Sequence, residues 1–232
     1  MTENTTPLVD IFQDPEHAAE YAEGPAKFVP GFRDLHRMAT ILLREYAPTN
    51  AEVLVHGAGG GLELEAFASA NPEWTFLGVD PAKPMLDEAK VRLGDLNERV
   101  KFHHGYTEDA PLGPFDAATS FLTLHFLERN ERRETVAEIV RRLKPGAPFI
   151  TAHCSFPQEA EQRATWLARH RAFSIASGVD PDLAEKGRKD ISERLHVYDP
   201  ETDEEILREA GLSNVTMFYA AFTWRGWFGR VS

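Results

Sequence analysis

The stretch from Val53 to Phe67, VLVHGAGGGLELEAF, constrains the fold of this chain more than any other segment. It begins with apolar residues that are typical of a short buried strand, continues through a glycine turn and ends in a helix-forming run. Glycine tolerates positive φ and lets a ligand approach the backbone, because it has no Cβ. The following helix presents free N–H groups and the positive end of its dipole to the turn. The stretch predicts a site for a nucleotide-type ligand, with a plain surface loop as the alternative.

The spacing of the glycines favours one class of ligand. A dinucleotide-binding turn has glycines at its first, third and sixth positions, and here the sixth position is Leu62. The turn instead has glycines at its first, third and fifth positions, which are Gly57, Gly59 and Gly61. A second apolar strand ends on Asp80, whose carboxylate could accept hydrogen bonds from both ribose hydroxyls of an adenosine. Alone, this acid would suit NAD as well as S-adenosylmethionine.

Strands and helices alternate along the chain. Apolar patterns predict strands at residues 53–55, 74–80, 100–104, 115–121, 147–154, 214–221 and 223–231, of which the last two form a hairpin. Helical patterns separate most of these strands. We therefore expect an α/β fold, with a mostly parallel seven-stranded sheet, right-handed crossovers and helices on both faces.

Two segments stand outside this alternation. Residues 1–30 are rich in Pro, Glu and Asp and are predicted to form a flexible, lid-like start before the domain of residues 31–232. Residues 157–196 exceed one crossover helix, so we expect a helical insertion that covers the ligand cleft or pairs with a second subunit. A last crossover helix is predicted to take Thr202 or Asp203 as its N-cap.

Composition restricts the expected class of substrate and the expected cellular compartment. The chain carries 25 Lys and Arg against 37 Asp and Glu, a net charge of −12, and such a surface argues against a nucleic-acid substrate. A single cysteine, Cys154, fits a reducing compartment. The N-terminus lacks the basic and apolar regions of a signal peptide, and no apolar run approaches the ~20 residues of a membrane helix. We expect a cytoplasmic protein that does not enter a membrane.

Five segments match, in order, the pattern of the class I S-adenosylmethionine-dependent methyltransferases. They are HGAGGG, GVDPAKPML, GYTEDAPL, FDAATSFLTLHFL and RRLKPGAPF, within residues 50–155. The resemblance implies a Rossmann-like methyltransferase fold with a reversed last strand, and S-adenosylmethionine across the carboxyl ends of the first strands. The cofactor-binding positions that it implies are Gly57, Ala58, Gly59, Gly61, Asp80, Pro81, Met85, Tyr106, Thr107 and Phe121.

A second resemblance extends over nearly the whole chain. The segments FVPGFRDL, LTLHFLERNERR, RHRAFSIASG and DPETDEEILREAGL resemble the carboxy-S-adenosylmethionine synthases, which act in wobble-uridine modification of tRNA. Those enzymes move a carboxylate-derived group from prephenate onto the sulfonium methyl group. An arginine of their helical insertion contacts the added carboxylate, and an alignment back from Ala210 and Gly211 places Arg188 at that position.

The chain departs from these patterns at three positions. Val55 replaces the acid two residues before the first glycine, Tyr106 replaces the acid after the third strand, and Phe121 replaces an asparagine of the synthases. Tyr106 and Phe121 could stack on adenine or flank the sulfonium, a contact of about 0.5–2 kcal/mol. Glu63 or Glu65 could take over from the missing acid; the alternative for each is a position facing solvent or a neighbouring helix.

No catalytic motif stands out. Methyl transfer from a sulfonium is an in-line displacement, for which the protein mainly supplies alignment. His125, just after the fourth strand, is a candidate base near an acceptor, and a packed, hydrogen-bonded histidine is the alternative. The histidines show no HxH or HxxxH spacing, so we expect no metal site.

Two side-chain clusters have structural interpretations. Five arginines interleave with glutamates at helical spacing and predict a salt-bridged solvent face rather than a tRNA-binding patch; they are Arg129, Arg132, Arg133, Arg141 and Arg142. The aromatic residues between Phe218 and Phe228 could line an acceptor pocket, pack on helices or contact a dimer partner.

The leading interpretation is an S-adenosylmethionine-dependent methyltransferase that acts on a small molecule. An enzyme like the carboxy-S-adenosylmethionine synthases is the second hypothesis. A non-catalytic protein that keeps the fold is the third, and it is motivated by Val55. The resemblance and the aromatic C-terminus favour a homodimer.

Overall fold

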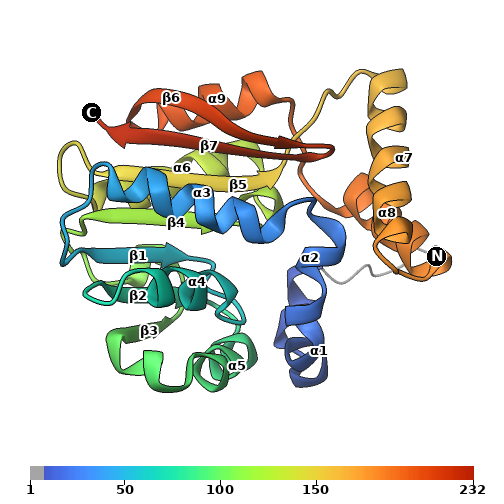
Figure 1. Ribbon diagram of the computed structural model, residues 1–232. Coiled ribbons are helices and arrows are strands. Elements are labelled where there is room, and N and C mark those ends of the chain that lie inside the picture. Colours follow the sequence, from blue (N-terminus) through green and yellow to red (C-terminus); the bar gives the residue numbers. More distant parts are fainter. Residues whose placement is uncertain (1–7) are drawn as a thin grey trace.

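A seven-stranded sheet forms the centre of the molecule (Figure 1). The computed structural model describes residues 8–232. The strand order is β3-β2-β1-β4-β5-β7-β6, in which β7 pairs antiparallel with β5 and β6 and the other pairs are parallel. The strands are β1 (Glu52–His56), β2 (Thr75–Asp80), β3 (Val100–His104), β4 (Ala117–Phe121), β5 (Pro148–Cys154), β6 (Leu212–Ala221) and β7 (Trp224–Val231).

Helices cover both faces of this sheet. The α-helices are α1 (Pro15–Glu20), α2 (Pro25–Phe28), α3 (Phe32–Arg44), α4 (Leu62–Ala70), α5 (Lys83–Leu93), α6 (Arg129–Arg141), α7 (Ala160–Ala176), α8 (Pro181–Arg194) and α9 (Pro200–Glu209). Short 3₁₀ helices are η1 (Leu8–Gln13), η2 (Tyr21–Glu23), η3 (Gly94–Arg99), η4 (Thr107–Asp109) and η5 (Leu124–Phe126). Helices α3, α4 and α5 contribute to the core on one face, and α6 and α9 to the core on the other. In the described residues, no helix is long and apolar enough to cross a membrane.

The alternation along β1 explains how the two cores form. Val53 and Val55 are fully buried under the α3 and α4 face, whereas Leu54 is fully buried under the α6 and α9 face. Side chains of a strand alternate between the two faces of a sheet, so a strand covered on both sides reads as continuously apolar. Burial of apolar surface on both faces, at about 25 cal/mol per Å², holds β1 in the middle of the sheet.

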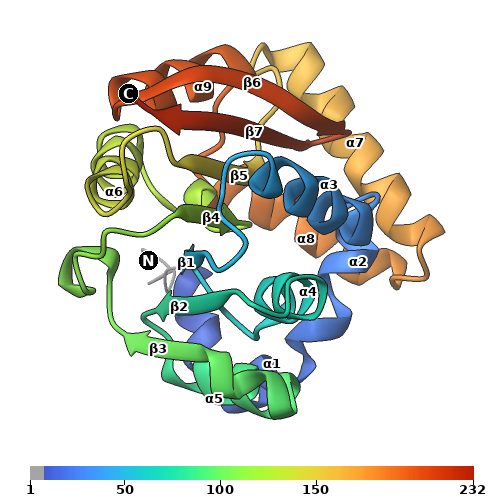
Figure 2. The ribbon, with the colours of Figure 1, turned by 60° about the vertical axis from the view of Figure 1, so that its left-hand side comes forward.

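The segments outside the sheet gather beyond the carboxyl ends of the parallel strands. In Figure 1, α1, α2, α7 and α8 stand on the side toward which β1 and β4 point. Helix α1 lies alongside α5 in both ribbon views (Figure 1 and Figure 2), and α7 packs on α8 and α2. The N-terminal segment therefore crosses the edge where open α/β sheets bind ligands.

The sequence-based expectation of a mostly parallel, seven-stranded α/β sheet is confirmed. The N-cap prediction for α9 is wrong, because Asp199 caps this helix by accepting a hydrogen bond from the N–H of Thr202 at 2.8 Å. Asp203 is instead buried, with 1% of its surface exposed. The division into residues 1–30, 31–232 and the insertion 157–196 stays a prediction, and residues 1–7 of the predicted flexible start lie outside the described residues.

The predicted solvent face of α6 is also wrong in part, because Arg132 and Arg142 are buried. Arg132 donates to the carbonyl of Leu124 at 2.9 Å and pairs with Asp203 of α9. Arg142 donates to the carbonyl of Glu108 at 2.9 Å. These long side chains close loops over the helix ends, which helical spacing of charges does not reveal. The other three arginines lie on the outside. Arg141 pairs with Glu138 at the expected helical spacing, whereas Arg129 pairs with Glu209 of α9 and Arg133 with the adjacent Glu134.

Candidate functional site

The glycine turn joins β1 to α4 at the carboxyl edge of the sheet. Gly57, Gly59 and Gly61 have φ values of 70°, 47° and 80°, in the region that favours glycine. Space gives a second reason at two of them. A Cβ on Gly57 would lie 2.1 Å from Thr123 Oγ1, and one on Gly61 would lie 3.0 Å from Ala89. The turn therefore requires glycine at its first and fifth positions.

Asp80 ends β2 beside this turn. Its Oδ2 accepts a hydrogen bond from the N–H of Gly59 at 2.9 Å, and its Oδ1 accepts one from the N–H of Ala82 at 2.8 Å. Burial raises the pKa of Asp80, although the two N–H groups oppose the shift. A carboxylate oxygen has more than one lone pair, so Asp80 can hold the turn and also accept hydrogen bonds from a diol.

An N-terminal segment, residues 8–24, closes over the turn and is called the N-terminal cover below. The ring of Tyr21 comes within 3.5 Å of the place where a Cβ on Gly60 would stand. Phe12 packs edge-on against Tyr21, with 5.7 Å between the ring centroids. Met85 of α5 belongs to the same small apolar cluster. The cover is therefore held by apolar contacts rather than by ion pairs.

Tyr21 lies close to two acids of the site. Burial, followed by the negative charges of Asp80 and Glu63, raises the pKa of its phenol. The hydroxyl therefore stays protonated at neutral pH. One side chain of the cover thus faces both the end of β2 and the start of α4.

Glu63, in the first turn of α4, is the second acid of the site. It is 6% exposed and lines the same pocket as the glycine turn. Burial raises its pKa to about 8, while the Thr119 hydroxyl and the N–H of Phe121 oppose the shift. Its Oε1 has no hydrogen-bond partner among the described residues. The alternative of a position facing solvent or a neighbouring helix is therefore wrong for Glu63.

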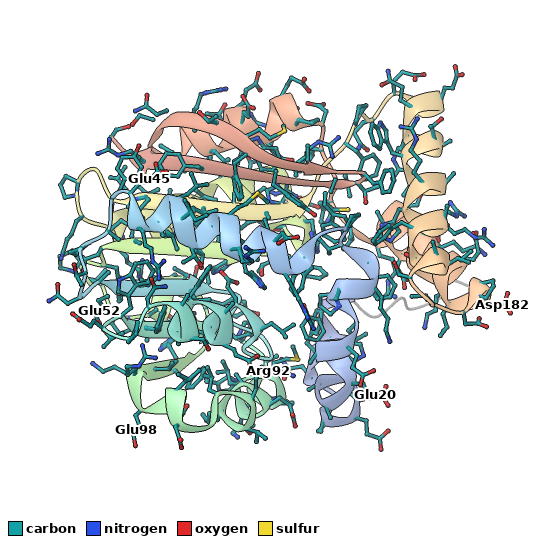
Figure 3. All side chains as sticks on the ribbon, viewed as in Figure 1. Glu20, Glu45, Glu52, Arg92, Glu98 and Asp182 are labelled. Carbon is teal, nitrogen blue, oxygen red and sulfur yellow. The ribbon has the colours of Figure 1, made fainter. Side chains whose placement is uncertain are left out.

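Glu65 meets the other expectation, although it stands only two residues further along α4. Its side chain keeps 44% of its surface exposed and lies 3.4 Å from the guanidinium of Arg92 on α5. Arg92, labelled in Figure 3, also donates to the carbonyl of Gly60 at 3.0 Å. Glu65 thus faces a neighbouring helix and carries a counter-charge.

Aromatic rings complete the pocket wall. Phe121, at the end of β4, stacks on His36 of α3 with 5.5 Å between centroids and 11° between planes. Phe32 meets the same imidazole edge-on at 4.5 Å. Burial lowers the pKa of His36 to about 4, so the ring is neutral at pH 7. In the described part of the chain, His36 Nε2 has no hydrogen-bond partner.

The pocket brings together four of the predicted cofactor residues and adds several that the sequence did not single out. Its lining is Tyr21, Phe32, His36, Gly57, Ala58, Gly59, Gly60, Leu62, Glu63, Phe121 and Leu122. Of the predicted positions, Gly57, Ala58, Gly59 and Phe121 are among them, and Gly61 completes the turn. The added residues Tyr21, Phe32 and His36 come from the cover and from α3.

Other predicted cofactor positions surround the pocket. Met85 Cε lies 3.4 Å from the place of a Cβ on Gly59. The carbonyl of Pro81 accepts a hydrogen bond from Gln13 of the cover at 3.2 Å. Thr107 is buried, and its Oγ1 lies 2.7 Å from His56 Nδ1. Tyr106 has 63% of its surface exposed, so in this conformation its ring does not stack on the buried wall.

The two candidate substrate residues do not line this pocket. Arg188 of α8 donates from Nε and Nη2 to Glu185 at 3.0 and 2.7 Å. His125 is 4% exposed, and its Nδ1 accepts a hydrogen bond from the N–H of Cys154 at 3.2 Å. Burial lowers the pKa of His125 well below its ordinary value. Both side chains are engaged within the fold, as the alternative interpretation of His125 expects.

The chemistry of the site fits an adenosine-type cofactor with a charged tail, but the enclosed space is small. Buried polar atoms such as Glu63 Oε1 and His36 Nε2 need a polar partner, because an unpaired buried group costs about 1–3 kcal/mol. The cavity measures about 30 Å³, roughly the room of one or two water molecules. The pocket as it stands therefore has room for ordered water but not for a nucleoside. In residues 8–232, no three metal-ligating side chains gather to hold a metal ion.

Part of the chain that carries this site matches a known family. Residues 53–146 match the family described as "Methyltransferase domain". A carboxy-S-adenosyl-L-methionine synthase from Campylobacter lari is 27% identical over 145 residues, which cover 62% of this chain and 62% of that protein. A carboxy-S-adenosyl-L-methionine synthase from Staphylococcus epidermidis is 20% identical over 231 residues, or 99% of each chain.

The solved structure of human N-acetylserotonin methyltransferase in complex with SAM shares the fold. It has a TM-score of 0.65 and 12% identity, and the match covers all of this chain and 60% of that one. The chain thus spans less than two thirds of both the human enzyme and the Campylobacter relative. The matches support the class I superfamily of S-adenosylmethionine-dependent methyltransferases. Within that superfamily it resembles the carboxy-S-adenosylmethionine synthase branch.

Proposed function

We propose that this protein is an S-adenosylmethionine-dependent methyltransferase that acts on a small-molecule acceptor. The observation that carries the proposal is the pairing of the positive-φ glycine turn with the buried Asp80 carboxylate, whose Oδ2 lies 2.9 Å from the N of Gly59. A backbone without Cβ atoms beside a hydrogen-bond acceptor suits a ribose and its diol. The net charge of −12 supports a small molecule rather than a nucleic acid as the acceptor.

Each part of the site has a role in this proposal. Asp80 accepts the ribose hydroxyls, and the glycine turn gives the chain of the cofactor room to pass. Phe121 and Phe32 supply apolar and aromatic surface beside the reacting centre, where a sulfonium gains about 0.5–2 kcal/mol from a ring face. The bound cofactor would supply an activated methyl group, so the protein's contribution is alignment and exclusion of water.

A carboxy-S-adenosylmethionine synthase-like activity is the second candidate, because relatives of that name match the chain over up to 99% of its length. The pocket supports this candidate less well. A cofactor with a second carboxylate needs a cation, and the lining residues include neither Arg nor Lys. Arg188 would have to leave Glu185, to which it donates at 2.7 Å, before it could serve.

Mass spectrometry of the small molecules released from freshly purified protein tests the two candidates. S-adenosylmethionine or S-adenosylhomocysteine supports the proposal and leaves an acceptor to be identified. A species heavier by one carboxylate supports the second candidate and makes Arg188 the residue to change. If the protein is empty and also fails to bind S-adenosylmethionine at millimolar concentration, both proposals fail and a non-catalytic role is favoured.

Replacement of Asp80 by alanine tests where the cofactor binds. We expect the dissociation constant for S-adenosylmethionine to rise more than tenfold, about 1.4 kcal/mol, because both ribose hydrogen bonds are lost. Asp87→Ala is the control, since this exposed acid of α5 pairs with Lys83 and Lys90. An unchanged constant for Asp80→Ala would refute this placement of the site. The homodimer and the cytoplasmic location stay predictions, which light scattering and cell fractionation would test.

A further inference from the structure

The two glutamates at the start of α4 share a helix turn but not an environment. Glu65 is half-exposed and lies 3.4 Å from Arg92. Glu63 is 6% exposed and forms no ion pair with any described residue. A helix N-terminus favours an acid in its first turn, but that preference is met equally by an exposed side chain such as Glu65. The burial of Glu63 requires another explanation.

The position of Glu63 relative to β1 and β4 supplies one. Its carboxyl group faces Thr119 and the N–H of Phe121 on β4. Thr119 is the register partner of Val55, and partners on neighbouring parallel strands point to the same side of the sheet. Glu63 therefore brings a carboxylate from α4 to the part of the sheet where β1 itself presents only the methyl groups of Val55.

The surroundings of this carboxylate are those of a cation site. The rings of Tyr21, Phe32 and Phe121 line the same pocket, together with the imidazole of His36. Aromatic faces beside a desolvated carboxylate attract organic cations, since the ring quadrupole and the negative charge act in the same direction. His36 Nε2 is a second buried polar atom without a partner in residues 8–232, and it independently indicates a polar ligand here.

The glycine turn separates the two acids of the pocket. Asp80 lies on the β2 side, where its Oδ2 accepts from Gly59. Glu63 lies on the β4 side, two residues after Gly61. Tyr21 approaches both of them from the N-terminal cover. A ligand that spans the turn from end to end would thus place hydroxyl groups at one acid and a cationic group at the other.

We propose that Glu63 receives the ammonium group of the cofactor's amino-acid moiety, from the opposite side of the glycine turn to Asp80. This inference rests on the proposed cofactor and adds a residue that discriminates between adenosine compounds. A ligand with an ammonium group gains the ion pair, whereas a ligand that ends at the thioether does not.

Calorimetric titration with two neutral-sulfur ligands tests the proposal. S-adenosylhomocysteine carries the amino-acid moiety, and 5′-methylthioadenosine lacks it. For Glu63→Gln, we expect the dissociation constant of S-adenosylhomocysteine to rise at least tenfold and that of 5′-methylthioadenosine to change less than twofold. Glu65→Gln is the matched control, with less than a twofold change for either ligand, because Glu65 is half-exposed and does not line the pocket.

The outcomes separate this inference from the proposed function. If the unchanged protein binds neither ligand, the proposed cofactor is wrong. If it binds both but Glu63→Gln weakens them equally, the cofactor stands and the ammonium assignment fails. If Glu63→Gln weakens only S-adenosylmethionine, the acid serves the sulfonium instead, which also overturns the assignment.

Proton release gives a second readout that a merely structural role would not change. Glu63 is largely protonated at pH 7 in the absence of a cation, so binding of an ammonium group expels its proton to the buffer. The apparent enthalpy of S-adenosylhomocysteine binding should therefore depend on the ionisation enthalpy of the buffer, and less so in Glu63→Gln. The titratable groups around Glu63 are Tyr21, His36 and Asp80, of which the first two stay neutral at this pH. Equal buffer dependence in both proteins contradicts the proposal.

Discussion

Two buried carboxyl groups, one on each face of the sheet, have pKa values that their surroundings shift in opposite directions. Asp203 of α9 has 1% of its surface exposed, and the Arg132 guanidinium and His153 Nε2 lie beside it, the latter at 3.2 Å. Burial pushes the pKa of Asp203 upward, but His153 and Arg132 outweigh burial and hold it below its ordinary value. Glu63 on the other face has no such counter-charge, and burial raises its pKa to about 8.

The difference separates a polar cluster that belongs to the fold from one that is completed by a ligand. A buried ion pair has already offset much of its desolvation penalty, and removal of one partner leaves an uncompensated charge. A buried acid without a partner carries that penalty in the folded state until a cation binds. The Asp203 cluster ties α6 and α9 together, whereas Glu63 stands at the pocket edge of α4. Stability measurements on the free protein can test this contrast.

Arg132→Met should have the largest effect on stability. It removes the guanidinium from Asp203 and takes one hydrogen-bond donor from each of the carbonyls of Leu124 and His196. We expect a loss of roughly 3–5 kcal/mol in the free energy of unfolding, the usual cost of breaking a buried pair from one side. Urea unfolding at pH 7 measures it.

Arg133→Met is the control for this change. Arg133 is the next residue of α6, keeps 40% of its side chain exposed and lies 3.4 Å from Glu134. Exposed pairs contribute about 0–1 kcal/mol, so its loss should stay within that range. Similar losses in the two variants would mean that Asp203 does not depend on Arg132 for its charge.

Glu63→Gln should have the opposite sign and a smaller size. The pKa of Glu63 is higher in the folded state, about 8, than its ordinary value of 4.5. Its contribution to stability is therefore fully present below pH 4.5 and is lost as the pH rises through 8. Glutamine does not ionise, so the variant should be more stable than the unchanged protein by roughly 2–4 kcal/mol at pH 9, with the gap closing near pH 4.5.

Thermal unfolding of both proteins between pH 4.5 and 9, without cofactor, checks this prediction. The Glu65→Gln variant serves as the control, because its acid is half-exposed and paired with Arg92. A Glu63→Gln variant that is less stable than the unchanged protein at pH 9 would show that the carboxylate has a counter-charge in the free protein.

Local patterns were sufficient to predict the sheet. The strands at residues 53–55, 74–80 and 147–154 were found because both faces of each are covered, so the runs are continuously apolar. Chain reversal at the glycine turn was readable because only glycine tolerates its φ values and its contact with Thr123. The burial of Arg132 could not be predicted from the sequence, because buried and exposed arginines occur at the same helical spacing.

The sequence predicted only those site residues that lie in the glycine turn or at the strand end beside it. Gly57, Gly59 and Asp80 follow from a turn and the strand end beside it. Tyr21 and His36 come from elements far from the turn in sequence, and no periodicity links them to it. The one available signal for Glu63 was its place in the first helical turn after the glycines, which it shares with Glu65. Only the packing of α4 on β4 distinguishes the two.

Tyr21→Ala tests how much the raised pKa of Glu63, in contrast to that of Asp203, depends on the N-terminal cover. Its pH-dependent effect on the free energy of unfolding should be the smallest of the three. The truncation lets water reach the pocket beside Gly60 and Glu63, since the Tyr21 ring packs near Gly60 and lines the same pocket as Glu63. A better hydrated carboxyl titrates closer to pH 4.5, so the fall in unfolding free energy between pH 4.5 and 9 should shrink by about 1 kcal/mol.

The variant is also expected to lose some stability at every pH, because Phe12 and Met85 lose a packing partner. The pH-dependent difference isolates the hydration of Glu63 from this uniform loss. If the slope with pH stays that of the unchanged protein, the walls formed by α3, α4 and β4 alone desolvate the acid, and the cover controls access to the site rather than the charge within it.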